Sequence, residues 1–144
     1  MIITDTHTHL YLKDFDADIN AVVSRALDLN INNFFLPAID SSHTKSMLNL
    51  KNAYPTIMHL MAGLHPCSVK KNYLEELNHV NEVVKNNSIV AIGEIGIDLY
   101  WDKTNLSIQK EAFANQIRLA KKLDLPIVIH CRDAFDEIFE VLEY

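Results

Sequence analysis

The chain has 144 residues, of which 49% are hydrophobic and 22% charged, a composition typical of one globular domain. Its formal net charge of −6 argues against a protein that coats nucleic acid through a broad basic surface, although an acidic enzyme can still handle nucleic acid in a pocket charged by divalent ions. No apolar run is long enough to span a membrane, no signal-peptide pattern follows Met1, and Cys67 and Cys131 lack the CxxC spacing. We therefore expect a reduced, cytoplasmic protein without a membrane partner.

Short apolar runs alternate with amphipathic helical patterns along the whole chain. The expected strands are residues 2–6, 33–36, 57–63, 89–93 and 127–130. Their continuous apolar character is typical of strands that are buried on both faces. Apolar positions at helical spacing predict helices over residues 19–27, 42–53, 74–84, 108–123 and 133–142.

This alternation predicts an α/β protein with a parallel sheet. No linker or low-complexity tract divides the chain, so we expect residues 1–144 to form a single domain. A doubly wound open sheet fits the pattern as well as a barrel does. That fold usually carries phosphate-binding glycines after its first strand, where this chain has histidines instead.

Two histidines, His7 and His9, directly follow the first expected strand. Side chains two residues apart on a strand point to the same face, so both imidazoles can bind one metal ion. A single buried histidine is as often a hydrogen-bonded core residue, but the pair at a strand end favours a metal site. Asp5, on the same face, either orients an imidazole or accepts backbone N–H groups.

Polar residues also follow other expected strands. His65 follows the third, Glu94 the fourth, and His130 and Arg132 the fifth. In a parallel barrel the carboxyl ends of all strands meet at one rim and form the active site, so this distribution favours a barrel. We place Glu94 in a turn after its strand, partly buried, where a carboxylate needs a cation or a metal ion.

Several of these residues have two readings. Arg132 can bind an anion through a bidentate contact or pair with a neighbouring aspartate such as Asp133. His65 fits a substrate contact and a structural role equally well. Asp98 and Tyr100 either contact substrate or support their loop. Neither cysteine has a base arranged beside it by the sequence, which disfavours a thiol nucleophile. The remaining histidines are expected to be structural or solvent-exposed: His43, His59 and His79.

Four motifs of the chain resemble those of the TatD-related metal-dependent deoxyribonucleases, members of the amidohydrolase-like TIM-barrel group. They are DTHTHL at residues 5–10, GLHP at 63–66, IGEIGID at 92–98 and LPIVIHCR at 125–132. Their order and spacing extend the resemblance over essentially the whole chain. Weaker matches lie on the helix before the last strand: Gln109, Phe113, Gln116 and Ala120.

The resemblance implies a cofactor of two divalent metal ions. His7 and His9 would bind one ion, His130 the second, and the catalytic Glu94 would bridge both. Zinc, manganese, magnesium and iron all suit such ligands. The implied reaction is hydrolysis of a phosphodiester bond in DNA, the substrate, by water that the two ions activate.

Two further implications concern the substrate. His65 and Arg132 would contact its phosphate group. No lysine stands at the position of Glu94, which disfavours the amidohydrolases that bridge their metals with a carboxylated lysine. The chain therefore resembles the nucleases rather than the cyclic-amide hydrolases of the same group.

The resemblance also implies a longer protein. A (β/α)8 barrel takes about 250 residues, and the family's other ligands follow its sixth and eighth strands. We therefore expect a parallel α/β fold of the (β/α)8 TIM-barrel type, truncated after about five β-α units. Two alternatives stay open: another barrel hydrolase acting on a small phosphoester, lactone or amide, and an inactive module that binds metal weakly or not at all.

Overall fold

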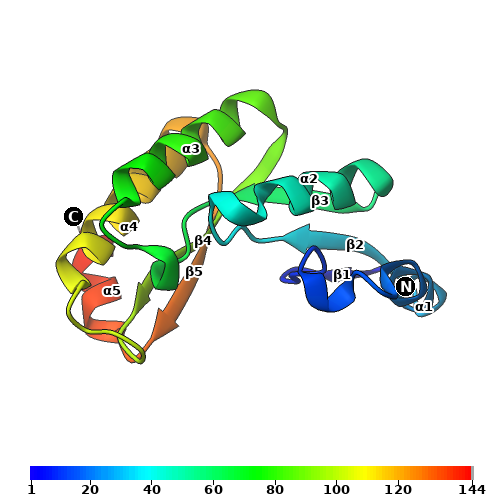
Figure 1. The fold of residues 1–144 in the computed structure, drawn as a ribbon, viewed down its shortest axis with the longest axis horizontal. Coiled ribbons are helices and arrows are strands. Elements are labelled where there is room, and N and C mark those ends of the chain that lie inside the picture. Colours follow the sequence, from blue (N-terminus) through cyan, green and yellow to red (C-terminus); the bar gives the residue numbers. More distant parts are fainter. Residues whose placement is uncertain (144) are drawn as a thin grey trace.

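The computed structural model describes residues 1–143, which form one curved, five-stranded parallel sheet with helices packed against it (Figure 1). Every expected strand and helix is present. The strands are β1 (Ile3–Asp5), β2 (Ile31–Leu36), β3 (Met58–Ala62), β4 (Ile89–Asp98) and β5 (Ile127–Arg132), and the helices are α1 (Ile19–Asp28), α2 (Thr44–Ala53), α3 (Tyr73–Asn86), α4 (Leu106–Leu123) and α5 (Phe135–Leu142).

The strands lie side by side in chain order, from β1 to β5, and each neighbouring pair is parallel. A doubly wound sheet reverses its strand order at one point, and this sheet does not. Of the two architectures that the pattern allowed, the sequential order of a barrel is the one observed. The carboxyl ends of all five strands therefore lie along one edge.

Most strand boundaries differ from the expected ones by one or two residues, and the end of β4 differs by five. β2 begins at Ile31, two residues before the predicted start, because Ile31 pairs with Ile3 across the sheet. β4 does not end at residue 93 but continues to Asp98, since its second half pairs with β5 from Ile95 onward. Glu94 therefore lies within a strand, and its predicted position in a turn is wrong.

Glycines in β4 allow it to approach β5 unusually closely. Gly96 has a φ of 144°, and a Cβ atom there would lie 2.0 Å from the carbonyl oxygen of His130. A Cβ at Gly93 would lie 2.6 Å from Cβ of Val128. Glycine is the residue that fits both positions, and the close approach brings Glu94 and His130 onto adjacent parts of the sheet edge.

The buried side chains form two hydrophobic clusters. One packs α1 and α2 against β2 and the start of β3 and includes Phe34 and Met47. The other packs α3, α4 and α5 against β4 and includes Ile95 and Phe113. Figure 1 shows α1 and α2 over one half of the sheet and α3 to α5 over the other. Across residues 1–143, none of the helices combines the length and the apolar character that a membrane crossing requires.

Candidate metal centre

Glu94 lies at the centre of a histidine cluster and is only 7% exposed. Its Oε2 atom lies 3.1 Å from Nε2 of His7 and 3.6 Å from Nε2 of His9. Its Oε1 atom lies 3.0 Å from Nδ1 of His130 and 3.9 Å from Nε2 of His65. The two carboxylate oxygens therefore face different imidazoles, and the structure brings together five of the residues that the sequence singled out.

The backbone of β4 holds Glu94 in this position. Ala38, just after β2, donates to the carbonyl of Gly93 at 2.9 Å and accepts from the amide of Glu94 at 3.2 Å. Burial alone would raise the pKa of Glu94, but hydrogen bonds from His130 and His9 outweigh it and hold the pKa well below its usual range. Glu94 is therefore an ionised carboxylate in a mostly closed site.

His65 and His130 face each other with opposite pKa shifts. Nε2 of His65 lies 3.2 Å from Nδ1 of His130. Burial lowers the pKa of His65 to about 4, so its imidazole is neutral at physiological pH. Hydrogen bonding to Glu94, supported by Asp98, raises the pKa of His130 against its own burial. The cluster thus pairs one neutral imidazole with one that is stabilised in its charged form.

Asp98 joins the cluster, a position that the sequence left undecided. It is 3% exposed, and its Oδ2 atom lies 2.8 Å from Nε2 of His130. Gln109 holds the backbone of Asp98 from both sides, accepting from its amide at 2.8 Å and donating to its carbonyl at 3.0 Å. Residues 94, 96 and 98 are spaced two apart on one strand and so point to the same face. This spacing in the IGEIGID motif could have predicted that Glu94 and Asp98 share a face.

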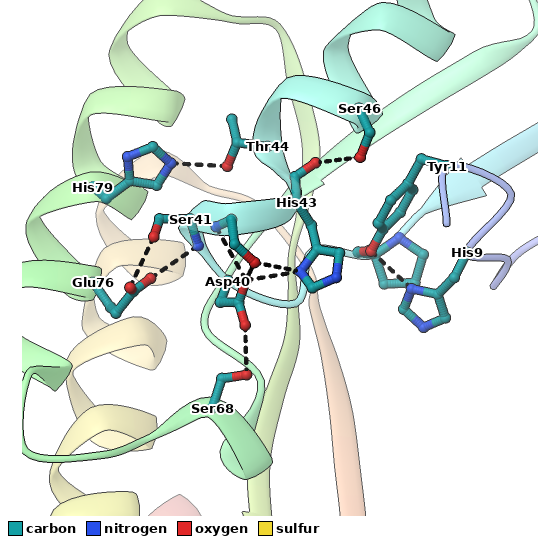
Figure 2. A network of polar contacts seen from close by, with 12 residues as sticks. His9, Tyr11, Asp40, Ser41, His43, Thr44, Ser46, Ser68, Glu76 and His79 are labelled. Atoms are coloured by element: carbon teal, nitrogen blue, oxygen red, sulfur yellow. Dashed lines mark hydrogen bonds and ion pairs between the residues drawn. The ribbon is translucent and has the colours of Figure 1, made fainter. Parts of the chain in front are cut away.

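Tyr11 contacts the cluster and was not identified from the sequence. Its hydroxyl lies 2.8 Å from Nδ1 of His9 and donates to the carbonyl of Pro37 at 2.5 Å (Figure 2). Burial and the nearby carboxylates of Glu94 and Asp40 raise the pKa of Tyr11, so the phenol keeps its proton. Because the hydroxyl donates to Pro37, the phenol oxygen accepts from Nδ1 of His9, so Nε2, the nitrogen that faces Glu94, is the one that could bind a cation.

A second polar network surrounds Asp40, after β2 (Figure 2). Asp40 accepts hydrogen bonds from Ser42, His43 and Ser68 at 2.6, 2.7 and 2.8 Å. Burial would raise the pKa of Asp40, but these hydrogen bonds lower it to about 2. The network ties the loop after β2 to the loop after β3. The other two histidines make separate contacts, His59 with Asn33 and His79 with Thr44.

Arg132 and Asp5 are placed differently from some of their expected roles. The guanidinium of Arg132 lies 3.7 Å from the ring centroid of Tyr100, and within residues 1–143 it forms no ion pair with an aspartate. Asp5 accepts the backbone amide of His7 at 3.1 Å. Of the two readings for Asp5, the structure shows the backbone acceptor.

The described residues offer two groups of possible metal ligands. In one, His7, His9 and Glu94 each present a ligand atom within 4.8 Å of the others. In the other, Cys67 joins His65 and His130 under the same limit. Burial and Asp98 raise the pKa of Cys67 to about 11, so its thiol is protonated in this arrangement. Imidazole and carboxylate donors suit zinc, manganese and iron, and the thiol adds a donor that favours softer ions.

Comparison with known proteins identifies close relatives over almost the whole chain. The sequence model of the TatD related DNase family matches residues 4–144. The metal-dependent hydrolase YabD of Bacillus subtilis (strain 168), named as uncharacterised, is 35% identical over 139 residues, which cover 96% of this chain and 54% of YabD. The 3′-5′ ssDNA/RNA exonuclease TatD of Pantoea sp. (strain At-9b) is 28% identical over 139 residues, with 96% and 54% coverage.

A solved structure agrees with this assignment. The crystal structure of YjjV, a TatD homologue from Escherichia coli K12, matches with a TM-score of 0.88 at 29% identity, covering 98% of this chain and 55% of that one. The chain thus spans about half the length of the relatives it matches. Because the family model matches from residue 4 to residue 144 and the fold agrees, this chain belongs to the TatD-related DNase family.

Proposed function

We propose that this chain carries part of the active site of a metal-dependent phosphodiesterase that hydrolyses DNA as a single strand. The observation that carries the proposal is the buried Glu94, whose Oε2 atom faces His7 and His9 while its Oε1 atom faces His130. A carboxylate that presents each oxygen to a different set of imidazoles is suited to bridge two cations. The names of the relatives, metal-dependent hydrolase and ssDNA/RNA exonuclease, support the same activity.

The donor set fits two divalent ions. His7, His9 and one oxygen of Glu94 would hold the first, and the other oxygen of Glu94 with His130 would hold the second. Such ions, when bound, polarise phosphate oxygens and lower the pKa of water. Tyr11 prepares His9 for this role, since its hydrogen bond leaves Nε2 free to act as a ligand.

Two residues beside these ligands can bind the phosphate group of the substrate. His65 is neutral because burial lowers its pKa to about 4, so it can hydrogen-bond a phosphate oxygen without carrying a charge. Arg132 remains charged and is held in place by stacking on Tyr100. Hydrogen bonds and positive charge directed at the non-bridging oxygens favour the more highly charged transition state.

The proposal is tested with Glu94→Gln. Glutamine keeps the size of the side chain but removes the charge that binds cations, so we expect bound metal to fall to background. Cleavage of an end-labelled single-stranded oligonucleotide in the presence of Mn²⁺ should fall by at least about 100-fold. Metal content is measured by mass spectrometry after gel filtration, which also gives the oligomeric state.

Glu76→Gln is the matched control. Glu76 accepts hydrogen bonds from Ser41 at 2.8 and 2.9 Å, outside the histidine cluster, so its loss should leave metal content and cleavage near those of the unaltered protein. Equal metal content in Glu94→Gln and the unaltered protein would contradict the proposal. So would cleavage by the unaltered protein that survives removal of divalent ions.

A further inference from the structure

A cavity of about 330 Å³ lies directly beside the histidine cluster, between the loop after β3 and the loop after β4. Its walls include Pro66, Cys67, Lys70, Asp98, Trp101 and Asp102. Two of these residues also belong to the cluster surroundings. Oδ2 of Asp98 lies 2.8 Å from Nε2 of His130, and the Cys67 sulfur lies within 4.8 Å of a ring nitrogen of His65 and of His130. The cavity therefore adjoins the place where the proposed function puts the phosphate group.

One wall of the cavity is an exposed aromatic side chain. Trp101 is 72% exposed, and it is the single tryptophan of the chain. Its ring packs edge to face with Tyr100, at a centroid distance of 4.7 Å and an interplanar angle of 90°. The Arg132 guanidinium covers Tyr100 at 3.7 Å and lies 5.5 Å from the indole. Trp101 is thus an exposed apolar surface supported by an edge-to-face contact with Tyr100 and by a nearby cation.

The polar walls of the cavity are already committed to other partners. Asn105 donates to the carbonyl of Val69 at 2.9 Å and accepts from Gln109 at 2.7 Å. Gln109 holds the backbone of Asp98. The Oδ1 atom of Asp102 accepts from Thr104 twice. The exposed residues among the walls are Trp101, Lys70, Cys67 and Asp102, and of these the indole of Trp101 offers the apolar face and Lys70 the positive charge. This surface suits the flat face of an aromatic ring and a neighbouring anion, and it offers little to read the edge of a particular base.

We infer that this cavity is a nucleobase pocket, in which one base of a single-stranded nucleic acid stacks on Trp101 while its phosphate lies at the Glu94 cluster. The inference rests on the proposed function and names the feature of the substrate that this site recognises. Stacking on an aromatic side chain is tolerant of base identity, because every base has a π-face. A base in this pocket is unstacked from its neighbours, so the pocket selects single strands over duplex. The positive charge of Lys70 attracts the phosphate backbone of the strand.

The single tryptophan makes the pocket directly observable. The probe is a phosphorothioate oligothymidylate, which resists hydrolysis, added in the presence of Mg²⁺ while Trp101 fluorescence is recorded. We expect saturable quenching. A strand of the same length and charge whose residues are abasic should quench little and bind about 10-fold more weakly, the loss that one missing stacked base causes.

Variants are compared by the fluorescence anisotropy of a labelled strand, because those at Trp101 lack the tryptophan signal. Trp101→Ala should weaken binding by about 10-fold, and Trp101→Phe should restore most of it. Phe139→Ala is the matched control, since Phe139 is an aromatic residue of similar exposure, 57%, on α5. Its affinity should equal that of the unaltered protein.

The outcomes separate this inference from the proposed function. Equal binding and quenching by the thymidylate and abasic strands would overturn the nucleobase pocket, as would binding without any quenching or no binding of either strand. Cleavage that depends on Glu94 but shows no Trp101 quenching would overturn only the pocket. Base-dependent quenching without metal-dependent cleavage would support the pocket and contradict the proposed hydrolysis.

Discussion

Nδ1 of His9 lies 2.8 Å from the hydroxyl oxygen of Tyr11, which donates its own proton to a backbone carbonyl. The phenol oxygen therefore accepts from Nδ1 of His9, and the Nε2 atom of the same ring lies 3.6 Å from Oε2 of Glu94. A histidine that binds a metal ion usually donates its other N–H to a carboxylate, a carbonyl or water. Here a buried phenol, which itself donates to the carbonyl of Pro37, would take that role.

Tyr11→Phe tests this role. Phenylalanine keeps the buried ring, 4% exposed in tyrosine, but removes the hydroxyl that accepts from His9. We expect divalent metal affinity to fall about 10- to 100-fold, as it does when a group that orients a metal ligand is lost. Isothermal titration with Zn²⁺ measures the change. Tyr54→Phe, which removes a hydroxyl bonded to Asn20 away from the cluster, should leave the affinity unaltered. Equal affinity in both variants would show that His9 needs no such partner.

Gln109→Leu should lower the free energy of unfolding by about 1–3 kcal/mol, because it leaves the buried amide and carbonyl of Asp98 without partners. Urea denaturation followed by circular dichroism gives the value. Lys121→Met, at an exposed position of the same helix, should change stability by less than about 0.5 kcal/mol. A similar small change at Gln109 would mean that the end of β4 is held by other contacts.

Gly96→Ala should destabilise the protein by about 3 kcal/mol. An alanine Cβ would lie 2.0 Å from the carbonyl oxygen of His130, and a φ of 144° is strained for any residue with a side chain. Differential scanning calorimetry should show a fall in Tm on the order of 10 °C. A variant with an unaltered Tm would show that β4 and β5 can separate at this point at little cost.

Asp40→Asn should reduce the loss of unfolding free energy that the protein shows when the pH falls from about 4 to about 2. The pKa of Asp40 is lowered to about 2 in the folded protein from an ordinary value of 3.8. The ionised group therefore contributes its full stabilisation above about pH 4, and this is lost as the pH falls toward about 2. For a partly exposed carboxylate we expect the variant to lose about 1 kcal/mol at neutral pH. Urea denaturation at pH 7 and pH 2.5 should show this difference shrinking in acid; a difference that stays constant would contradict the assignment.

Much of the fold was predictable because its signals are local. The continuous apolar runs and the helical spacing identified all five strands and all five helices, and polar residues at strand ends predicted that His7, His9 and His130 meet near Glu94. The end of β4 was not predictable in this way. Glycines often interrupt or weaken strands, so Gly93 and Gly96 suggested that β4 ends early. They are present because β5 approaches closely, which is visible only in three dimensions.

The contacts that the sequence missed depend on partners far along the chain. The role of Tyr11 depends on the carbonyl of Pro37, after β2, which accepts a hydrogen bond from the Tyr11 hydroxyl. Arg132 lies over the ring of Tyr100 and, across residues 1–143, forms no ion pair with an aspartate. This contact depends on the pairing of β4 with β5, which sets Arg132 beside Asp98, two residues before Tyr100. Neither contact has a spacing that a linear pattern can reveal.

The two hydrophobic clusters give the histidine site a wider consequence. His7 and His9 follow β1, beside the cluster of α1 and α2, whereas Glu94 and His130 lie on strands that pack against α3 to α5. A cation shared by His7, His9 and Glu94 would link the part of the sheet that packs against α1 and α2 to the part that packs against α3 to α5. The affinity for the cation would then depend on the curvature of the sheet, because the curvature sets the distance between these ligands. Met47→Ala, which creates a cavity far from every ligand, should therefore lower the affinity by letting the two parts of the sheet move relative to each other.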